Sequence, residues 1–247
     1  MNLCIFPSRD AANAAAVDGL AGWLAAPGVR NVMVAGGNTP LDLYAGIARL
    51  GLNLAHLNVF MLDEYVGVPA DEPRNCANLL LRTVVAAWHI PPDQFFAVSS
   101  RREDALASAI AQERRLAAGG LDVIILGLGP NGHLGFNEPG SRRDSTARVV
   151  DLVPSSVEAN RRWFGGDYAP AQGATVGLTT ILAARHVLLL GFGAHKQTAV
   201  KAMIEGPETA ACPASFLQSH PNTFLFLDDA AAGTLDRETR RTRGGGQ

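Results

Sequence analysis

Cysteine is scarce in this chain, which has only three, Cys4, Cys76 and Cys212, among 247 residues. Three scattered cysteines cannot build a disulfide framework, and none of them stands in a metal-ligand spacing. None has a histidine nearby in the sequence, which disfavours a cysteine nucleophile. We expect buried thiols, with Cys4 as a small core residue inside a strand-like run.

Long apolar runs and a strong excess of charge are also missing. No run reaches the ~18 apolar residues of a membrane span, and the N-terminus, MNLCIFPSRD, lacks the basic region and longer apolar core of a secretory signal. Only two lysines occur, and the formal net charge is -2. There is no electrostatic reason to expect a nucleic-acid or membrane partner, and we expect a cytoplasmic protein.

The chain does contain enough apolar sequence for one large domain. Hydrophobic residues make up 47% of the 247 residues and charged residues 18%, which is typical of a globular protein. Strand-like segments at 2–6, 31–34, 57–62, 122–126, 149–153 and 186–190 are interleaved with helix-like segments at 8–25, 41–50, 75–88, 101–118, 155–163 and 197–205. This order predicts a single α/β domain over 1–234, with a doubly wound, mostly parallel sheet and helices on both faces. The stretch 235–247 is expected to be disordered.

A cluster of polar side chains follows the run 122–126, whose composition is that of a strand buried on both faces. Glycines follow directly and are expected to end the strand. Just beyond them come Asn131, His133, Asn137 and Glu138, at the edge where open α/β sheets hold their ligands. An imidazole, a carboxylate and two amides at that edge predict a proton-transfer site.

Two other interpretations of this stretch exist. Residues 127–132 match the GxGxxG string of dinucleotide-binding loops, but that string needs a helix at its last glycine, and Pro139 and Gly140 indicate a loop. Alternatively, His133 and Glu138 are solvated loop residues. An ordinary loop would not need so many positions that permit positive φ and close backbone approach, here glycines 127, 129, 132, 135 and 140. The glycines therefore favour a functional site.

A second glycine loop, 35–40, joins the predicted strand 31–34 to the predicted helix 41–50. Thr39 and Pro40 suit the N-cap and first helical positions. Unpaired N–H groups and the helix dipole converge at such a junction, which makes it a phosphate cradle by geometry. An ordinary strand-to-helix turn would also use glycine and a cap, so on spacing alone the two interpretations are equal.

Two adjacent acids, Asp63 and Glu64, stand at the end of the predicted strand 57–62. Neighbouring side chains at a strand end point to opposite sides, so at most one of them enters a shared cleft. Taken alone, Asp63 is better explained as a helix cap or a surface acid.

The segment GLGPNGHLGFNEP at 127–139 resembles the active-site signature of the glucosamine-6-phosphate deaminases, also called isomerases. That family has relatives that act on galactosamine 6-phosphate and a more distant branch, the 6-phosphogluconolactonases. The resemblance extends from Met1 to about Asp229 and implies a modified Rossmann-like fold, with 1–234 as a sugar-phosphate deaminase/isomerase domain. It also implies a strand and turn at 175–179, a late helix at 212–220 and a last strand at 223–227.

Three short segments bear on the branch of the family. The loop GGNTP at 36–40 is closer to the lactonase version than to the TGGTP form of the deaminases. The segment DEYVG at 63–67 is similar to the deaminase motif, since lactonases usually have arginine where Tyr65 stands, and FNEP at 136–139 agrees with it. The resemblance therefore favours a glucosamine-6-phosphate deaminase, which yields fructose 6-phosphate and ammonium.

The resemblance implies a role for each polar residue of the site. Asp63 is the base that takes the proton from C2 of the sugar and returns one to C1. His133 moves a proton at the ring oxygen, with Glu138 orienting it or relaying the proton. Asn131 stands where some deaminases have aspartate and cannot exchange a net proton, so we interpret it as a tolerated variant.

Substrate and phosphate binding are implied for Gly36, Gly37, Asn38, Thr39, Arg162 and Lys196. Lys196 stands in the first turn of a helix, where a cation opposes the helix dipole unless an anion lies between them. The bidentate guanidinium of Arg162 suits phosphate, although a solvent-exposed Arg161-Arg162 pair explains it equally well. His195 is interpreted as a bystander, and no metal or organic cofactor is required.

Three alternative functions remain open. Two are enzymes: a galactosamine-6-phosphate deaminase/isomerase, and a 6-phosphogluconolactonase, which would hydrolyse an ester without releasing ammonia. The third is a non-catalytic regulator that binds sugar phosphate. A regulator needs no base, so the presence of Asp63, His133 and Glu138 favours an enzyme. The expected partner is a small-molecule sugar phosphate, and the protein is expected to be a monomer or a homo-oligomer.

Overall fold

A seven-stranded sheet forms the centre of the computed structural model, which describes residues 1–243. Every pair of neighbouring strands in it is parallel. In spatial order the strands are β1 (Asn2–Phe6), β10 (Thr223–Asp228), β9 (His186–Gly191), β6 (Val123–Gly127), β2 (Asn31–Val34), β3 (Asn58–Met61) and β5 (Phe95–Phe96). The predicted buried strand, β6, lies in the middle of the sheet.

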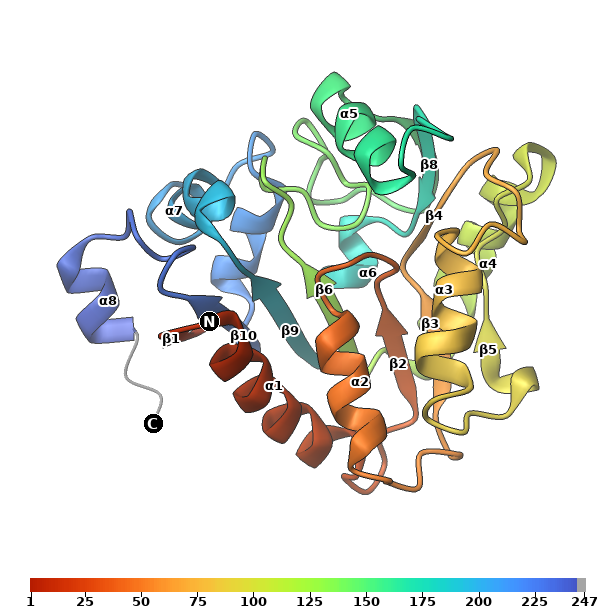
Figure 1. Ribbon diagram of the computed structural model, residues 1–247, viewed down its shortest axis with the longest axis horizontal. Helices are drawn as coiled ribbons and strands as arrows, with labels where there is room; N and C mark the ends of the chain where they lie inside the picture. The colour runs from red at the N-terminus through yellow and green to blue at the C-terminus, as the bar shows by residue number, and fades with distance from the viewer. Residues whose placement is uncertain (244–247) are drawn as a thin grey trace.

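Helices cover both faces of this sheet, as predicted. One face carries α1 (Arg9–Leu24), α2 (Leu41–Arg49) and α3 (Cys76–Leu80), which continues as a π-helix over Leu81–Val85; the first two lie in front of the sheet in Figure 1. The other face carries α6 (Leu178–Leu182), α7 (Gln197–Glu205), a 3-10 helix (Pro213–Ser219) and the end of α4 (Arg102–Gly119). None of the helices that the structure describes is long and apolar enough to cross a membrane.

The central strands are mostly apolar because both of their faces are covered, and their polar residues lie at strand ends, such as Asn31 and Asn58. Within β2, Val32 and Val34 contribute to the core under α1 and α2, whereas Met33 between them contributes to the core on the opposite face. Successive side chains of a strand point to opposite faces, so a strand covered on both sides is apolar at its interior positions.

The chain reverses its direction across the sheet between β2 and β6. From β2 the strands proceed outward to β3 and β5; β6 then returns to the other side of β2, and β9 and β10 extend the sheet the opposite way. The loops that leave β2 and β6 therefore diverge at the carboxyl edge. A crevice at such a point is the usual ligand site of open α/β sheets.

A second, three-stranded antiparallel sheet lies beyond that edge. It has the order β4 (Asp63–Tyr65), β8 (Gln172–Thr175), β7 (Arg148–Asp151). Helix α5 (Pro154–Trp163) lies beside it, at the top of Figure 1. The sequence did not predict β4 or β5, because strands of two or three residues are too short to show an alternating pattern.

The predicted cap of α2 is wrong. Pro40 occupies the N-cap position, and no side chain caps the helix. The side chain of Thr39 instead packs against Gly127, where an added Cβ would lie 3.2 Å from the Thr39 Cβ. Thr39 is therefore turned toward the ligand crevice rather than toward the helix.

The strand and turn expected at 175–179 is also wrong, because β8 ends at Thr175 and the helix α6 covers Leu178–Leu182. Smaller differences concern caps, helix type and the C-terminal stretch. Neither Ser155 nor Ser156 caps α5, which begins with Pro154, a residue that has no N–H group to satisfy. The late helix at 212–220 is of the 3-10 type. Within the stretch expected to be disordered, the structure has α8 (Arg237–Arg243), where Arg240 pairs with Asp229. Residues 244–247 lie outside the described residues.

Candidate active site

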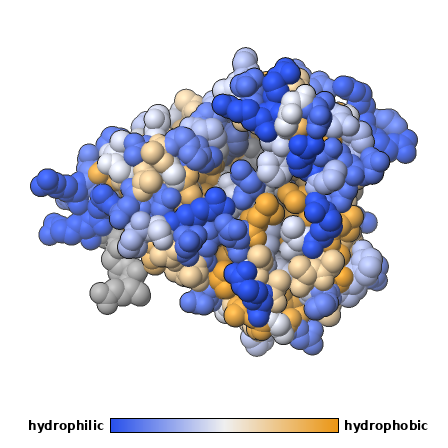
Figure 2. Space-filling model, in the orientation of Figure 1, coloured by the Kyte–Doolittle hydropathy of each residue, from blue (hydrophilic) through white to orange (hydrophobic). Residues whose placement is uncertain are grey.

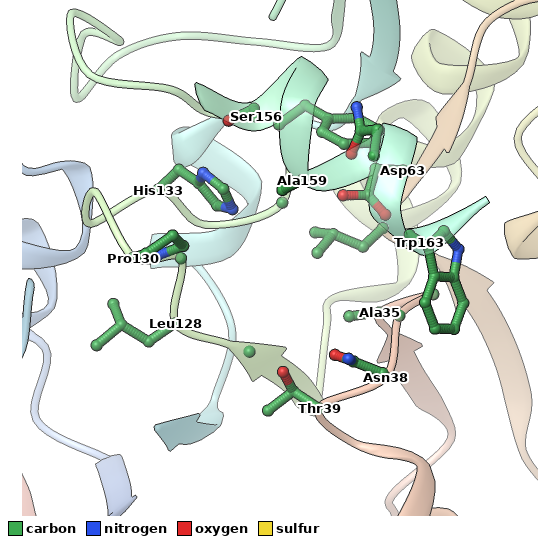
Figure 3. Close-up of a pocket in the computed structure, with 18 of the residues that line it drawn as sticks. Ala35, Asn38, Thr39, Asp63, Leu128, Pro130, His133, Ser156, Ala159 and Trp163 are labelled. Carbon is green, nitrogen blue, oxygen red and sulfur yellow. The ribbon is translucent and has the colours of Figure 1, made fainter. Parts of the chain in front are cut away.

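A pocket of about 260 Å³ opens at the crevice between the loops that follow β2 and β6. Both loops, β4, α5 and the turn before α7 line it: Ala35, Gly36, Gly37, Asn38, Thr39, Pro40, Leu62, Asp63, Tyr65, Gly127, Leu128, Gly129, Pro130, His133, Gly135, Phe136, Ser155, Ser156, Ala159, Asn160, Trp163 and Lys196. Figure 3 shows Asp63 and His133 under α5, with Asn38 and Thr39 at the opposite side of the cavity. Of the predicted site residues, Asn131, Glu138 and Arg162 do not line it.

The loop 35–40 is held firmly in place. A Cβ on Gly36 would lie 2.5 Å from the Cβ of Cys76, so only glycine fits there. The hydroxyl group of Tyr44 donates a hydrogen bond to the carbonyl oxygen of Ala35 at 2.9 Å, which ties the loop to α2. The loop thus lies at the start of a nine-residue helix, where backbone N–H groups and the helix dipole favour an anion.

Lys196 lies in the 3-10 turn Ala194–Lys196 after β9, at the N-cap position of α7. Among the residues that the structure describes, it has no ion pair or hydrogen bond with its side chain. Burial lowers the pKa of its ammonium group to about 8. A half-buried cation that faces a cavity without a carboxylate partner fits an anionic ligand. His195 beside it is exposed.

Asp63 enters the pocket from β4 and is only 6% exposed. Gly135 lies against it, where a Cβ would be 3.0 Å from the Asp63 Oδ2. Gly135 has a φ of +58°, so the chain can turn there without strain only because the residue is glycine. Burial and, to a lesser degree, the charge of Glu64 raise the pKa of Asp63 to about 8. This carboxyl group can therefore take and release a proton near neutral pH.

Glu64 points away from the pocket and is fully buried. Its Oε1 accepts from the N–H groups of Tyr65 at 2.8 Å and Cys76 at 3.1 Å, and its Oε2 accepts from Ala77 at 2.8 Å. Burial raises the pKa of Glu64 to about 7, and these backbone donors oppose the rise. The prediction that at most one of the two acids enters the cleft is confirmed.

His133 faces the cavity in front of a polar pair. Its Nδ1 lies 3.3 Å from the Glu138 Oε2, which also accepts from the Asn131 Nδ2 at 2.8 Å. Burial alone would raise the pKa of Glu138, but hydrogen bonds from His133, Ser156 and Asn131 outweigh it, so the pKa lies below its ordinary value. An ionised carboxylate behind an imidazole holds the ring in a fixed orientation. Within residues 1–243, no group of three His, Cys, Asp or Glu side chains could hold a metal ion.

Two candidates from the sequence lie away from the cavity. Asn137 is fully buried and donates to the carbonyl oxygens of Leu134 and Val176, each at 3.0 Å, so its contacts hold the loop together. Arg162 is exposed on α5. Figure 2 shows a mainly hydrophilic surface where α5 lies, which agrees with the exposure of Arg161 and Arg162.

The lining side chains of α5 were missed by sequence reasoning. Ser156, Ala159, Asn160 and Trp163 all face the pocket. Their spacing of three and four residues puts them on one face of a helix, so the periodicity was present in the sequence. The sequence did not indicate that this face lies over the loops that follow β2 and β6. The position of α5 depends on the second sheet, because α5 connects β7 to β8.

Comparison with known proteins gives consistent matches over most of the chain. Residues 8–225 match the family model described as glucosamine-6-phosphate isomerases/6-phosphogluconolactonase. A glucosamine-6-phosphate deaminase of Cutibacterium acnes is 39% identical over 241 residues, which cover 95% of this chain and 92% of that protein. One from Corynebacterium kroppenstedtii is 42% identical, covering 83% of this chain and 82% of that protein.

Solved structures agree with the sequence matches. A monomeric glucosamine-6-phosphate deaminase superposes with a TM-score of 0.89 at 29% identity, covering 94% of this chain and 99% of that one. A 6-phosphogluconolactonase from Trypanosoma cruzi has a TM-score of 0.76 at 22% identity, covering 95% of this chain and 96% of that one, which shows a shared fold.

Proposed function

The chain belongs to the family of glucosamine-6-phosphate isomerases and 6-phosphogluconolactonases, and we infer that it is a glucosamine-6-phosphate deaminase. It converts glucosamine 6-phosphate and water to fructose 6-phosphate and ammonium. The observation that carries this inference is that three groups face one cavity of about 260 Å³: a buried carboxyl group, an imidazole, and an ammonium group with no partner within residues 1–243. These are the groups needed to move protons on a sugar and to hold its phosphate.

We propose that the phosphate lies between the loop 35–40 and Lys196. The N–H groups of Gly36 to Thr39 would donate to its oxygens, and the ammonium group of Lys196, which pairs with no carboxylate among the described residues, would supply the counter-charge. Binding energy from this end of the substrate then positions the sugar over the reacting groups. Arg162, exposed on α5, remains a predicted second contact; a rise in KM for Arg162→Ala would support it.

The proposed reaction starts at His133. Its imidazole moves the proton that opens the pyranose ring of the sugar. Glu138 orients the imidazole through its contact with Nδ1, and Asn131 orients Glu138 by donating a hydrogen bond to it. Asn131 donates a hydrogen bond to Glu138 and cannot exchange a proton with it. Glu138 is therefore the one carboxylate of the proposed proton relay, and it lies on one side of the imidazole.

Asp63 then acts as the base. In its ionised form it takes the proton from C2 of the open-chain amino sugar and returns one to C1, and water releases ammonium from the resulting imine carbon. The raised pKa makes Asp63 a stronger base than an exposed aspartate, which suits removal of a weakly acidic C–H proton.

Ammonia release tests this proposal. The purified protein is given glucosamine 6-phosphate, galactosamine 6-phosphate and 6-phosphogluconolactone in separate reactions, with Asp63→Asn as the control. We expect ammonium and fructose 6-phosphate from the first substrate, and none from the variant. Lactone hydrolysis without ammonia release from either amino sugar would refute the proposal.

We also propose that the enzyme works in the cytoplasm, since a phosphorylated sugar carries a charge that keeps it from crossing membranes unaided. We propose that the protein is a monomer or a homo-oligomer. Cell fractionation and light scattering would test the two statements separately.

A further inference from the structure

The helix over the pocket, α5, is only weakly packed against the rest of the protein. It contributes five residues to the pocket lining, yet Asn160 is the only buried residue within the helix. The side chain of Asn160 donates to the carbonyl oxygen of Pro170 at 3.0 Å, which anchors the helix to the segment that follows it. Val157 and Trp163 are only partly buried, and the fully buried Phe164 stands at the C-cap. Polar contacts therefore contribute much of what holds the helix itself in position.

Arg74, in the segment between β4 and α3, makes several such contacts with the end of α5. Its Nη1 donates to the carbonyl oxygen of Trp163 at 3.5 Å, and its own carbonyl oxygen accepts from the Trp163 Nε1 at 3.3 Å. Its Cζ lies 5.5 Å from the centroid of the Phe164 ring. A guanidinium at the last carbonyl of a helix is also favoured by the helix dipole.

Two carboxylates hold the guanidinium of Arg74 in that position. Its Nε donates to the Glu72 Oε1 at 2.6 Å, and its Nη2 donates to the Asp167 Oδ2 at 3.0 Å. Glu72 belongs to the same segment as Arg74, whereas Asp167 lies beyond α5. Arg74 therefore connects the segment that follows Asp63 to the segment that follows α5.

We propose that Arg74 is a positioning residue that holds α5 over the substrate pocket and so sets the affinity for the sugar phosphate. The proposal rests on the proposed function for its substrate. Trp163 is the link, since it both lines the pocket and contacts Arg74 through its ring N–H and its carbonyl group. Without the arginine, α5 would cover the pocket for a smaller fraction of the time.

The effect should fall mainly on binding. When the binding-competent arrangement is populated only in part, the apparent dissociation constant rises by the inverse of that fraction. We expect Arg74→Ala to raise KM for glucosamine 6-phosphate by about tenfold, while kcat falls less than about threefold, because the saturated pocket holds the helix in place.

Kinetics and hydrogen exchange test the proposal together. Wild type, Arg74→Ala and Arg74→Lys are compared with Arg161→Ala, which removes an exposed arginine of α5 whose ion pair, with Glu158, lies within the same helix. We expect faster amide exchange over 154–163 in Arg74→Ala alone, no change over 102–119, and slower exchange when inorganic phosphate is added. Arg74→Lys should recover part of the affinity, since it keeps a charge but not the planar fork.

Two results for Arg74→Ala would overturn the proposal. One is an unchanged KM together with unchanged amide exchange over 154–163. The other is a fall in kcat together with faster exchange throughout the protein, which would indicate a general structural role. The exchange comparison needs no turnover, so it still tests the role of Arg74 if wild type releases no ammonia, a result that would count against the proposed function alone.

Discussion

Replacing Asp63 by asparagine should change how the stability of the protein depends on pH. The pKa of Asp63 is about 8 in the folded chain, against 3.8 for an ordinary aspartate. Between these values the folded chain binds a proton on Asp63 that the unfolded chain has released. The free energy of unfolding of the wild type therefore falls as pH rises through this window, and the full cost of burying the charge is present above about pH 8.

The magnitude follows from the width of the window. One such group changes the free energy of unfolding by at most ~1.4 kcal/mol per pH unit. From about pH 5 to about pH 8 this sums to ~4 kcal/mol as an upper limit. Water in the open pocket reduces the cost of charging the carboxyl group, so we expect roughly half, about 2 kcal/mol. Asparagine has nearly the same shape and does not titrate, so Asp63→Asn loses this contribution.

The assay is urea unfolding of wild type and Asp63→Asn at several pH values between about 5 and 8. The quantity of interest is the difference between their free energies of unfolding, because groups that do not interact with Asp63 cancel in it. Asp18→Asn makes the same chemical change at an exposed position on α1. We expect the variant at Asp63 to gain stability over wild type as pH rises, and Asp18→Asn to show no trend.

A difference that stays constant over this pH range would refute the reasoning, since Asp63 would then have the same pKa folded and unfolded. An opposite trend would mean that the folded protein stabilises the ionised form, through contacts that outweigh burial. In either case the raised basicity of Asp63 could not be part of the mechanism.

Three further predictions concern the binding and orienting groups. Lys196→Met should raise KM by roughly 10- to 100-fold in a steady-state assay, because it removes a charge-assisted hydrogen bond to phosphate. The control Lys201→Met removes a lysine that pairs with Glu205 and Asp236, and it should leave KM unchanged in the same assay. Glu64→Gln should move the acidic limb of the kcat/KM profile to lower pH, because removing the neighbouring negative charge lowers the pKa of Asp63; an unmoved limb would contradict this. Glu138→Gln should lower kcat by about 10²-fold or more through loss of imidazole orientation, and a kcat near wild type would show that the carboxylate is dispensable.

The groups around His133 could be predicted because they are close in the sequence. His133, Glu138 and Asn131 lie within one loop after a strand, so their contacts are local. The glycine loop at 35–40 could be predicted for the same reason, since strand, loop and helix start follow one another directly. The sequence alone does not decide whether the loop binds phosphate; in the structure Lys196 lines the same pocket as the loop, which supports the proposed phosphate site.

The capping errors and the missed strands share a physical cause. Thr39 has the residue type of a cap, but its side chain packs on Gly127, a residue far along the chain. Asp63 was expected to end a strand, and it begins a new one, β4, because it pairs with Thr175 of β8. Local propensity cannot report a partner that only the folded chain brings near.

The sequence by itself determined the order of most strands and helices, the two glycine loops and the chemical groups they carry, because each depends on residues next to one another. The tertiary structure decided which of these groups share a cavity. It buried Asp63 and so raised its pKa, left Lys196 without a partner among the residues that the structure describes, and placed α5 beside both, in contact with Arg74. Burial, charge and enclosure are properties of the surroundings of a side chain, and those surroundings come from segments that are distant in the sequence.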